Sequence, residues 1–106
     1  MNLKTHTENG YMEVIIHDDC SFDKAYSIAN ILTKNFNLFF SKKLNDLESF
    51  YWDFEYKGNR LTLHYNIFVG LSIFPMTFKK ASDADNNSVV EISSLLSKYL
   101  IENNME

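Results

Sequence analysis

The sequence predicts an α+β fold, in which an antiparallel sheet of four to five strands carries two helices on one face, in the order β-α-β-β-β-(β)-α. Two observations lead to this prediction. Segments with alternating apolar residues follow one another through the middle of the chain, and a helical apolar stripe lies on either side of them. Because each stripe forms one apolar face, both helices should pack on the same side of the sheet.

The first strand is predicted at residues 11–17, where Met12, Val14 and Ile16 alternate with other residues. A helix follows, with Ser21 or Asp19 as its N-cap. Its apolar stripe consists of Phe22, Ala25, Tyr26, Ala29, Leu32 and Phe36, and it ends at Asn35 to Asn37. Residues 1–9 and 102–106 are expected to be frayed ends of a single domain that spans residues 1–106.

A β-hairpin formed by residues 49–57 and 60–67 is the best-supported local element. Gly58-Asn59 is typical of a two-residue turn of the primed type. With this turn, apolar residues of the two strands lie opposite each other and polar residues do likewise. The resulting register pairs Lys57 with Arg60, Tyr56 with Leu61, Phe54 with Leu63, Trp52 with Tyr65, and Asp53 with His64.

Two further strands flank this hairpin. Residues 37–44 form the strand before it, joined to it by a polar turn at residues 45–48. Residues 71–75 form the strand after it, and Pro75 indicates that this strand ends or lies at an edge.

The second helix is predicted after a polar loop at residues 79–87. Ser88 and Glu91 have the spacing of a capping box. The helix then continues to about residue 101 with an apolar stripe that consists of Val89, Ile92, Leu95, Leu96, Tyr99 and Leu100.

Charge composition favours a basic partner over nucleic acid. The formal net charge of the 106-residue chain is -4, and its basic residues cluster only as the pairs Lys42-Lys43 and Lys79-Lys80. Binding to phosphate needs a basic footprint, which is missing here. An acidic protein is instead attracted to a basic protein surface.

Cysteine content and hydropathy indicate a cytoplasmic location. Cys20 is the single cysteine, so no internal disulfide can form and nothing points to an oxidising compartment. The first ten residues lack the apolar core of a secretory signal. No apolar run approaches the 18 residues expected of a membrane span, so no membrane association is predicted.

The polar face of the hairpin carries Asp53, Glu55 and His64, which admit more than one interpretation. A carboxylate and a histidine could act in acid–base catalysis or bind a metal. They could also be the solvated face of an antiparallel sheet. A metal site usually has three or four converging ligands, and no supporting motif accompanies these residues.

A second candidate is Cys20, with His17 nearby in sequence. A thiol at a helix start could be a nucleophile, because the helix dipole lowers its pKa. A single free cysteine is more often a small buried apolar residue. Asp18 and Asp19 are best explained as caps and dipole partners of the helix. Neither a P-loop nor a dinucleotide-binding motif occurs, so we expect a protein without enzymatic activity, cofactor or metal.

Partner recognition is the interpretation that accounts for all the residues of the polar face. A flat acidic face with an aromatic residue and hydrogen-bonding groups suits a basic protein surface. The candidate partner-binding residues are Tyr51, Asp53, Glu55, Thr62, His64 and Asn66 on the hairpin, together with Asp46 and Glu48 in the preceding turn. A merely solvated face remains the alternative.

The hairpin motif W-x-F-x-x-x-G-x-x-L-x-L-H-Y, from Trp52 to Tyr65 with Asp46 upstream, resembles that of a family of small uncharacterised bacterial proteins. The β-α-β-β-β-α order of that family implies the same fold for residues 11–100. An acidic residue usually follows the tyrosine in the family, and a tryptophan lies in its last strand. Here Asn66 and the sequence SIFP occupy these places.

By size, acidity and cytosolic character, the chain also resembles the immunity proteins of bacterial polymorphic toxins, including those of contact-dependent growth inhibition. This resemblance implies a cytoplasmic protein that neutralises one cognate toxin, commonly a basic nuclease domain, by occluding its active site or substrate surface. The alternative is a non-catalytic regulatory or scaffolding domain that binds an endogenous cytosolic protein. Oligomeric state does not follow from either resemblance.

Overall fold

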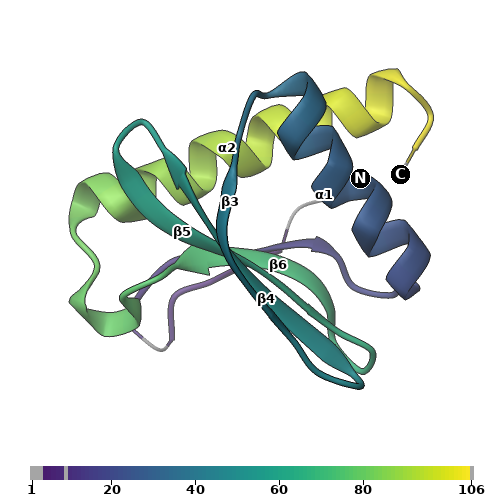
Figure 1. Ribbon diagram of the computed structural model, residues 1–106. Coiled ribbons are helices and arrows are strands. Elements are labelled where there is room, and N and C mark those ends of the chain that lie inside the picture. Colours follow the sequence, from purple (N-terminus) through teal and green to yellow (C-terminus); the bar gives the residue numbers. More distant parts are fainter. Residues whose placement is uncertain (1–3, 9, 106) are drawn as a thin grey trace.

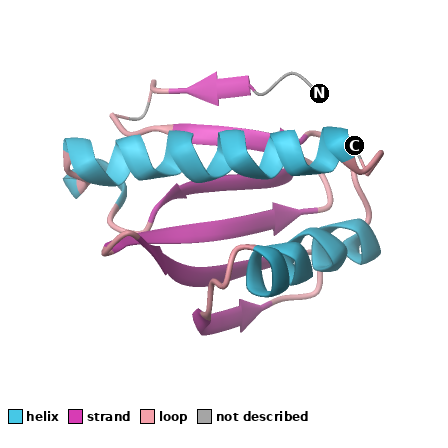
Figure 2. Ribbon diagram, turned by 90° about the horizontal axis from the view of Figure 1, so that it is seen from above, coloured by secondary structure: helices cyan, strands magenta, loops and turns pink. Residues whose placement is uncertain are grey.

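The structure is a computed structural model of the chain, and it describes residues 4–8 and 10–105. The described residues form a six-stranded antiparallel sheet with the strand order β1-β2-β6-β5-β4-β3. The strands are β1 (Lys4–His6), β2 (Glu13–His17), β3 (Phe40–Asn45), β4 (Ser49–Tyr56), β5 (Asn59–Asn66) and β6 (Gly70–Pro75). Helices α1 (Phe22–Asn35) and α2 (Asp83–Glu102) lie on one side of the sheet (Figure 1, Figure 2).

The predicted α+β class with both helices on one face of an antiparallel sheet is therefore confirmed, whereas the strand count was too low. The additional strand is β1, which pairs with β2 so that Lys4 lies opposite Ile15 and His6 opposite Glu13. Its three polar residues carry no apolar alternation, so only backbone pairing identifies it as a strand. Residues 4–6 are thus part of the sheet, and residues 1–3 and 9 lie outside the described residues.

The C-terminal end is also more structured than predicted. Helix α2 extends to Glu102, and Met105 packs against the hydrophobic core. The backbone N–H of Met105 donates to the carbonyl oxygen of Leu100 at 2.8 Å. Residue 106 lies outside the described residues.

The hairpin of β4 and β5 turns one residue earlier than predicted. Lys57 and Gly58 have the positive φ angles, 51° and 80°, that a primed turn requires at its two central positions. The register is consequently displaced by two residues, so that Asp53 lies opposite Thr62 and His64 opposite Tyr51. The predicted Asp53–His64 pair is wrong. A displacement of two keeps every side chain on its predicted face, which is why the apolar pattern could not detect the error.

The other hairpin pairs follow this displacement. In place of the five predicted pairs, the structure aligns Tyr56 with Asn59, Glu55 with Arg60, Phe54 with Leu61, Trp52 with Leu63, and Phe50 with Tyr65. Strand β3 also begins three residues later than predicted, at Phe40. Asn37, where the strand was expected to start, has a φ of 56° and cannot be extended.

Helix α1 begins as predicted, because the Ser21 side chain accepts a hydrogen bond from the N–H of Lys24. Helix α2 begins six residues earlier than the capping box predicted for it. Its box is formed by Ser82 and Asp85, and a short 3₁₀ helix, Phe78–Lys80, occupies part of the predicted loop. The first helical turns are mostly polar and only partly buried, so hydrophobic periodicity marks only the part of α2 that crosses the sheet.

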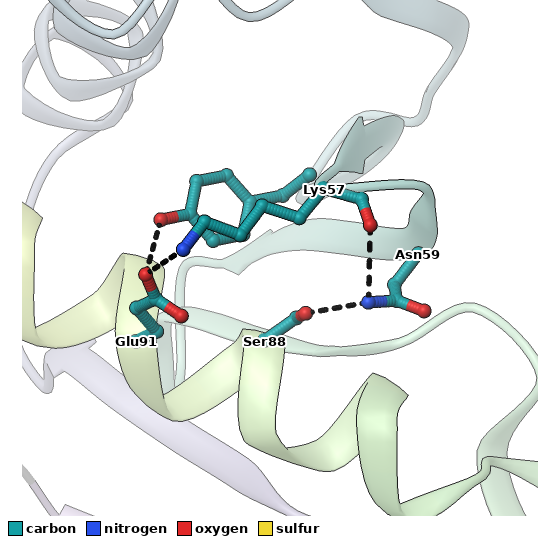
Figure 3. Close-up of polar contacts among 5 residues, drawn as sticks. Lys57, Asn59, Ser88 and Glu91 are labelled. Atoms are coloured by element: carbon teal, nitrogen blue, oxygen red, sulfur yellow. Dashed lines mark hydrogen bonds and ion pairs between the residues drawn. The ribbon is translucent and has the colours of Figure 1, made fainter.

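The core fills the space between the helices and the sheet. Its largest fully buried side chains include Tyr65, Phe50 and Phe54 on the central strands. Helix α2 covers β2, β5 and β6, whereas α1 contacts β5. Polar contacts tie the β4–β5 turn to α2: Tyr56 and Lys57 donate to the Glu91 carboxylate, and the Asn59 amide donates to the Ser88 hydroxyl at 2.7 Å (Figure 3).

Candidate partner-binding surface

The predicted hairpin residues lie together on the sheet face opposite the helices. Strand alternation turns Trp52 toward α1, where its ring stacks on Tyr26 at a centroid distance of 5.6 Å. The six hairpin residues of the predicted surface have the opposite parity and therefore occupy the other face: Tyr51, Asp53, Glu55, Thr62, His64 and Asn66. Asp46 and Glu48 lie in the β3–β4 turn, at one end of the sheet, rather than on this face.

Part of this face is covered. Thr62 is only 3% exposed, and its hydroxyl donates to the Asp53 carboxylate at 2.6 Å. Phe74 lies opposite Thr62 on β6 and is buried beneath the rings of Tyr11 and Phe78. The segment after β6 therefore covers the β6 part of the face, and Thr62 is not available to a partner.

His64 belongs to an aromatic row and not to an acid–base pair. Its ring stacks on Tyr51 at a centroid distance of 4.2 Å and lies 5.7 Å from the ring of Phe74. Burial lowers the pKa of His64 below its usual value, while the charge of Glu13 acts in the opposite direction. The buried Nε2 atom has no hydrogen-bond partner among the described residues. The imidazole is therefore a mostly neutral ring at neutral pH.

The exposed charges on this face have mixed signs, contrary to the predicted acidic face. In the observed register Lys42 lies beside Asp53, and Arg60 lies beside Glu55. No ion pair within 4.0 Å joins these four groups, all of which belong to the described residues. They line one hollow of about 510 Å³, whose wall also includes Asn37, Leu38, Phe39, Ser41, Phe54 and Met76. A ligand in this hollow would meet the carboxylates of Asp53 and Glu55 and the cations of Lys42 and Arg60.

The surroundings of Cys20 do not activate its thiol as a nucleophile. Burial raises the pKa of the Cys20 thiol to about 11, and the charge of Asp19 adds to this effect. The thiolate, which is the nucleophilic form, is thereby disfavoured. Asp18 is engaged by Lys4, with 2.5 Å between Oδ2 and Nζ. Across residues 4–8 and 10–105, no three His, Cys, Asp or Glu side chains come together as a metal site.

Sequence reasoning missed one surface feature, the apolar tip, which consists of Leu47, Ile67, Phe68 and Val69. Leu47 lies in the β3–β4 turn, and the other three lie in the β5–β6 turn. Leu47 is 91% exposed and Phe68 is 75% exposed. The run Ile67 to Val69 before Gly70 was the available signal, because three consecutive apolar residues are unusual in a turn.

Comparison with protein-family models, curated proteins and solved structures gives no match for this chain. Among the described residues, neither α1 nor α2 is both long and apolar enough to cross a membrane.

Proposed function

We propose that the chain is an immunity protein that binds a cognate toxin, a basic nuclease domain, and occludes its active site or substrate surface. The observation that carries this proposal is the part of the sheet face, opposite α1 and α2, that β4 and β5 form. Tyr51, Asp53, Glu55 and the half-buried His64 lie there on two paired strands, where no helix covers them. A sheet face of this kind is a rigid platform, and rigid platforms lose little entropy on binding.

Charge supports a basic partner. The net charge of -4 attracts a basic domain over a distance of about 8–10 Å at physiological salt. Lys42 and Arg60 lie next to the carboxylates and limit which basic proteins can bind. A toxin without acidic groups opposite these cations would meet like charges, so the mixed hollow favours one cognate toxin over other basic proteins.

Charge variants on the hairpin test this proposal. Because Asp53 accepts a hydrogen bond from the buried Thr62 hydroxyl, Asp53→Asn removes the charge while keeping an acceptor for that hydroxyl. Asp53→Asn combined with Glu55→Lys should slow association with the toxin and weaken binding at least tenfold. Cells that express toxin with this variant should lose protection.

The matched control is Asp83→Asn with Glu102→Lys, which makes the same change in charge on exposed residues of α2. Both variants should show the circular dichroism spectrum of the unaltered protein. A folded hairpin variant that protects cells fully and binds with unchanged affinity would show that recognition lies elsewhere. If no toxin gene lies beside the gene for this chain, the regulatory or scaffolding function becomes the better proposal.

A further inference from the structure

The apolar tip presents four exposed hydrophobic side chains on two neighbouring turns. The β3–β4 and β5–β6 turns project side by side at the end of the sheet, beyond the helices (Figure 1). Leu47 and Phe68 are almost entirely exposed, and Ile67 and Val69 are exposed beside them. Exposed apolar side chains gathered on two adjacent turns are typical of an interaction site.

Hydrogen bonds hold the two turns in place. The backbone N–H of Ile67 donates to the carbonyl oxygen of Glu48 at 3.0 Å, which joins one turn to the other. Within the turns, Asp46 accepts from the N–H of Leu47 and Asn66 accepts from the N–H of Phe68, both at 2.8 Å. The apolar side chains are therefore presented on ordered backbone, which reduces the entropy lost on binding.

Acidic residues surround the apolar tip. Asp46 and Glu48 flank Leu47 in its own turn, and residues 66–70 contain no Lys or Arg. The backbone of Gly70 lies against His17 and Asp18, so the loop that carries Asp19 is also next to the β5–β6 turn. Two cations lie at this loop: Lys4 pairs with Asp18, and Lys24 is close enough to Cys20 for its charge to act on the thiol.

This charge distribution favours some binding partners of the apolar tip over others. Anionic lipid headgroups would be repelled by Asp46 and Glu48. A second copy of the chain would bring the same carboxylates into contact with each other. A protein cleft with apolar walls and Lys or Arg side chains at its rim would satisfy both the apolar and the acidic groups.

We infer that the apolar tip inserts into an apolar cleft rimmed by Lys and Arg side chains on a partner protein. That this partner is the toxin rests on the proposed function. The chemistry of the cleft follows from the tip itself. Leu47 and Phe68 are the anchor residues, and Asp46 and Glu48 contact the basic rim.

The test uses two synthetic helical peptides with the same leucine stripe, one flanked by lysines and the other by glutamates. The full chain, labelled with ¹⁵N, is titrated with each peptide and followed by NMR. The lysine peptide should shift amide signals of residues 44–51 and 66–70 and should bind at least tenfold more tightly than the glutamate peptide. Phe68→Ser should weaken this binding at least tenfold.

Leu95→Ser is the matched control, because Leu95 is also an exposed leucine but lies on α2 rather than on either turn or in the hollow. It should leave the affinity for the lysine peptide unchanged. Equal affinities for the two peptides, or an equal effect of Leu95→Ser, would overturn the inference. So would Phe68-dependent binding to phosphatidylcholine–phosphatidylglycerol vesicles, or a Phe68-dependent dimer in sedimentation. Since no toxin is used, these outcomes are independent of the test of the proposed function.

Discussion

Gly70 is the residue at which a single added methyl group should harm the fold most. It begins β6 with a φ of +94°, and a Cβ atom there would lie 2.1 Å from the carbonyl oxygen of His17. The same atom would lie 2.9 Å from Cα and C of Asp18. These are backbone atoms that cannot rotate aside, so Gly70→Ala requires β2 and β6 to move apart.

Gly58→Ala provides a matched comparison. Gly58 also has a positive φ, +80°, but no heavy atom lies within 4 Å of the position that its Cβ would take. An alanine in this backbone region costs about 1–2 kcal/mol at either site. At Gly70 the forced contact adds about 1–3 kcal/mol of overpacking. The free energy of unfolding should therefore fall by about 1–2 kcal/mol for Gly58→Ala and about 2–5 kcal/mol for Gly70→Ala.

Urea denaturation followed by far-UV circular dichroism measures this difference. With a slope of about 1–3 kcal/mol/M, the transition midpoint should fall by roughly 1 M or more for Gly70→Ala and by clearly less for Gly58→Ala. Both variants must keep the slope of the unaltered protein for the comparison to hold. Equal midpoints for the two variants would refute the close approach of His17 and Asp18 to Gly70.

Two further predictions concern buried polar groups. Because burial lowers the pKa of His64, the unfolded chain binds a proton more readily than the folded chain, so stability should fall as pH decreases below about 6.5. His64→Phe, which preserves the stack on Tyr51, should weaken this dependence, and identical pH profiles for the two proteins would contradict the reasoning. The buried Ser93 hydroxyl on α2 has no hydrogen-bond partner among the described residues. Ser93→Ala should therefore raise the free energy of unfolding by about 1 kcal/mol in the same urea assay, and a lower value would show that the hydroxyl is satisfied.

The parts of the fold that the sequence predicted are those encoded by side-chain periodicity. Alternation placed Trp52 and Phe54 on the core face and Asp53 and Glu55 on the other, which is how the structure has them. Periodicity does not encode register, because moving a strand by two residues changes its partners but not its faces. Strand β1 and the start of α2 were missed for a related reason, since both are polar and are defined by backbone hydrogen bonds.

The surface was harder to predict than the core. The six hairpin residues do share one face, but their accessibility depends on segments distant in sequence. Thr62 and Phe74 are buried because of contacts that the alternation of β5 and β6 does not reveal. The apolar tip depends on two turns about 20 residues apart that meet through an Ile67–Glu48 hydrogen bond. Neither turn alone indicates that they form one patch.

The position of α2 in the chain has a consequence for biosynthesis. Helix α2 packs against β2, β5 and β6, yet every strand of the sheet is translated before it. The chain between Pro75 and Glu102 takes on the order of 1–5 s to make at about 5–20 residues per second. Until α2 has left the ribosome and packed against the sheet, the strands that have already emerged expose apolar side chains that other nascent chains can contact. The yield of folded protein should therefore depend on growth temperature and chaperone supply, even where the finished fold is stable.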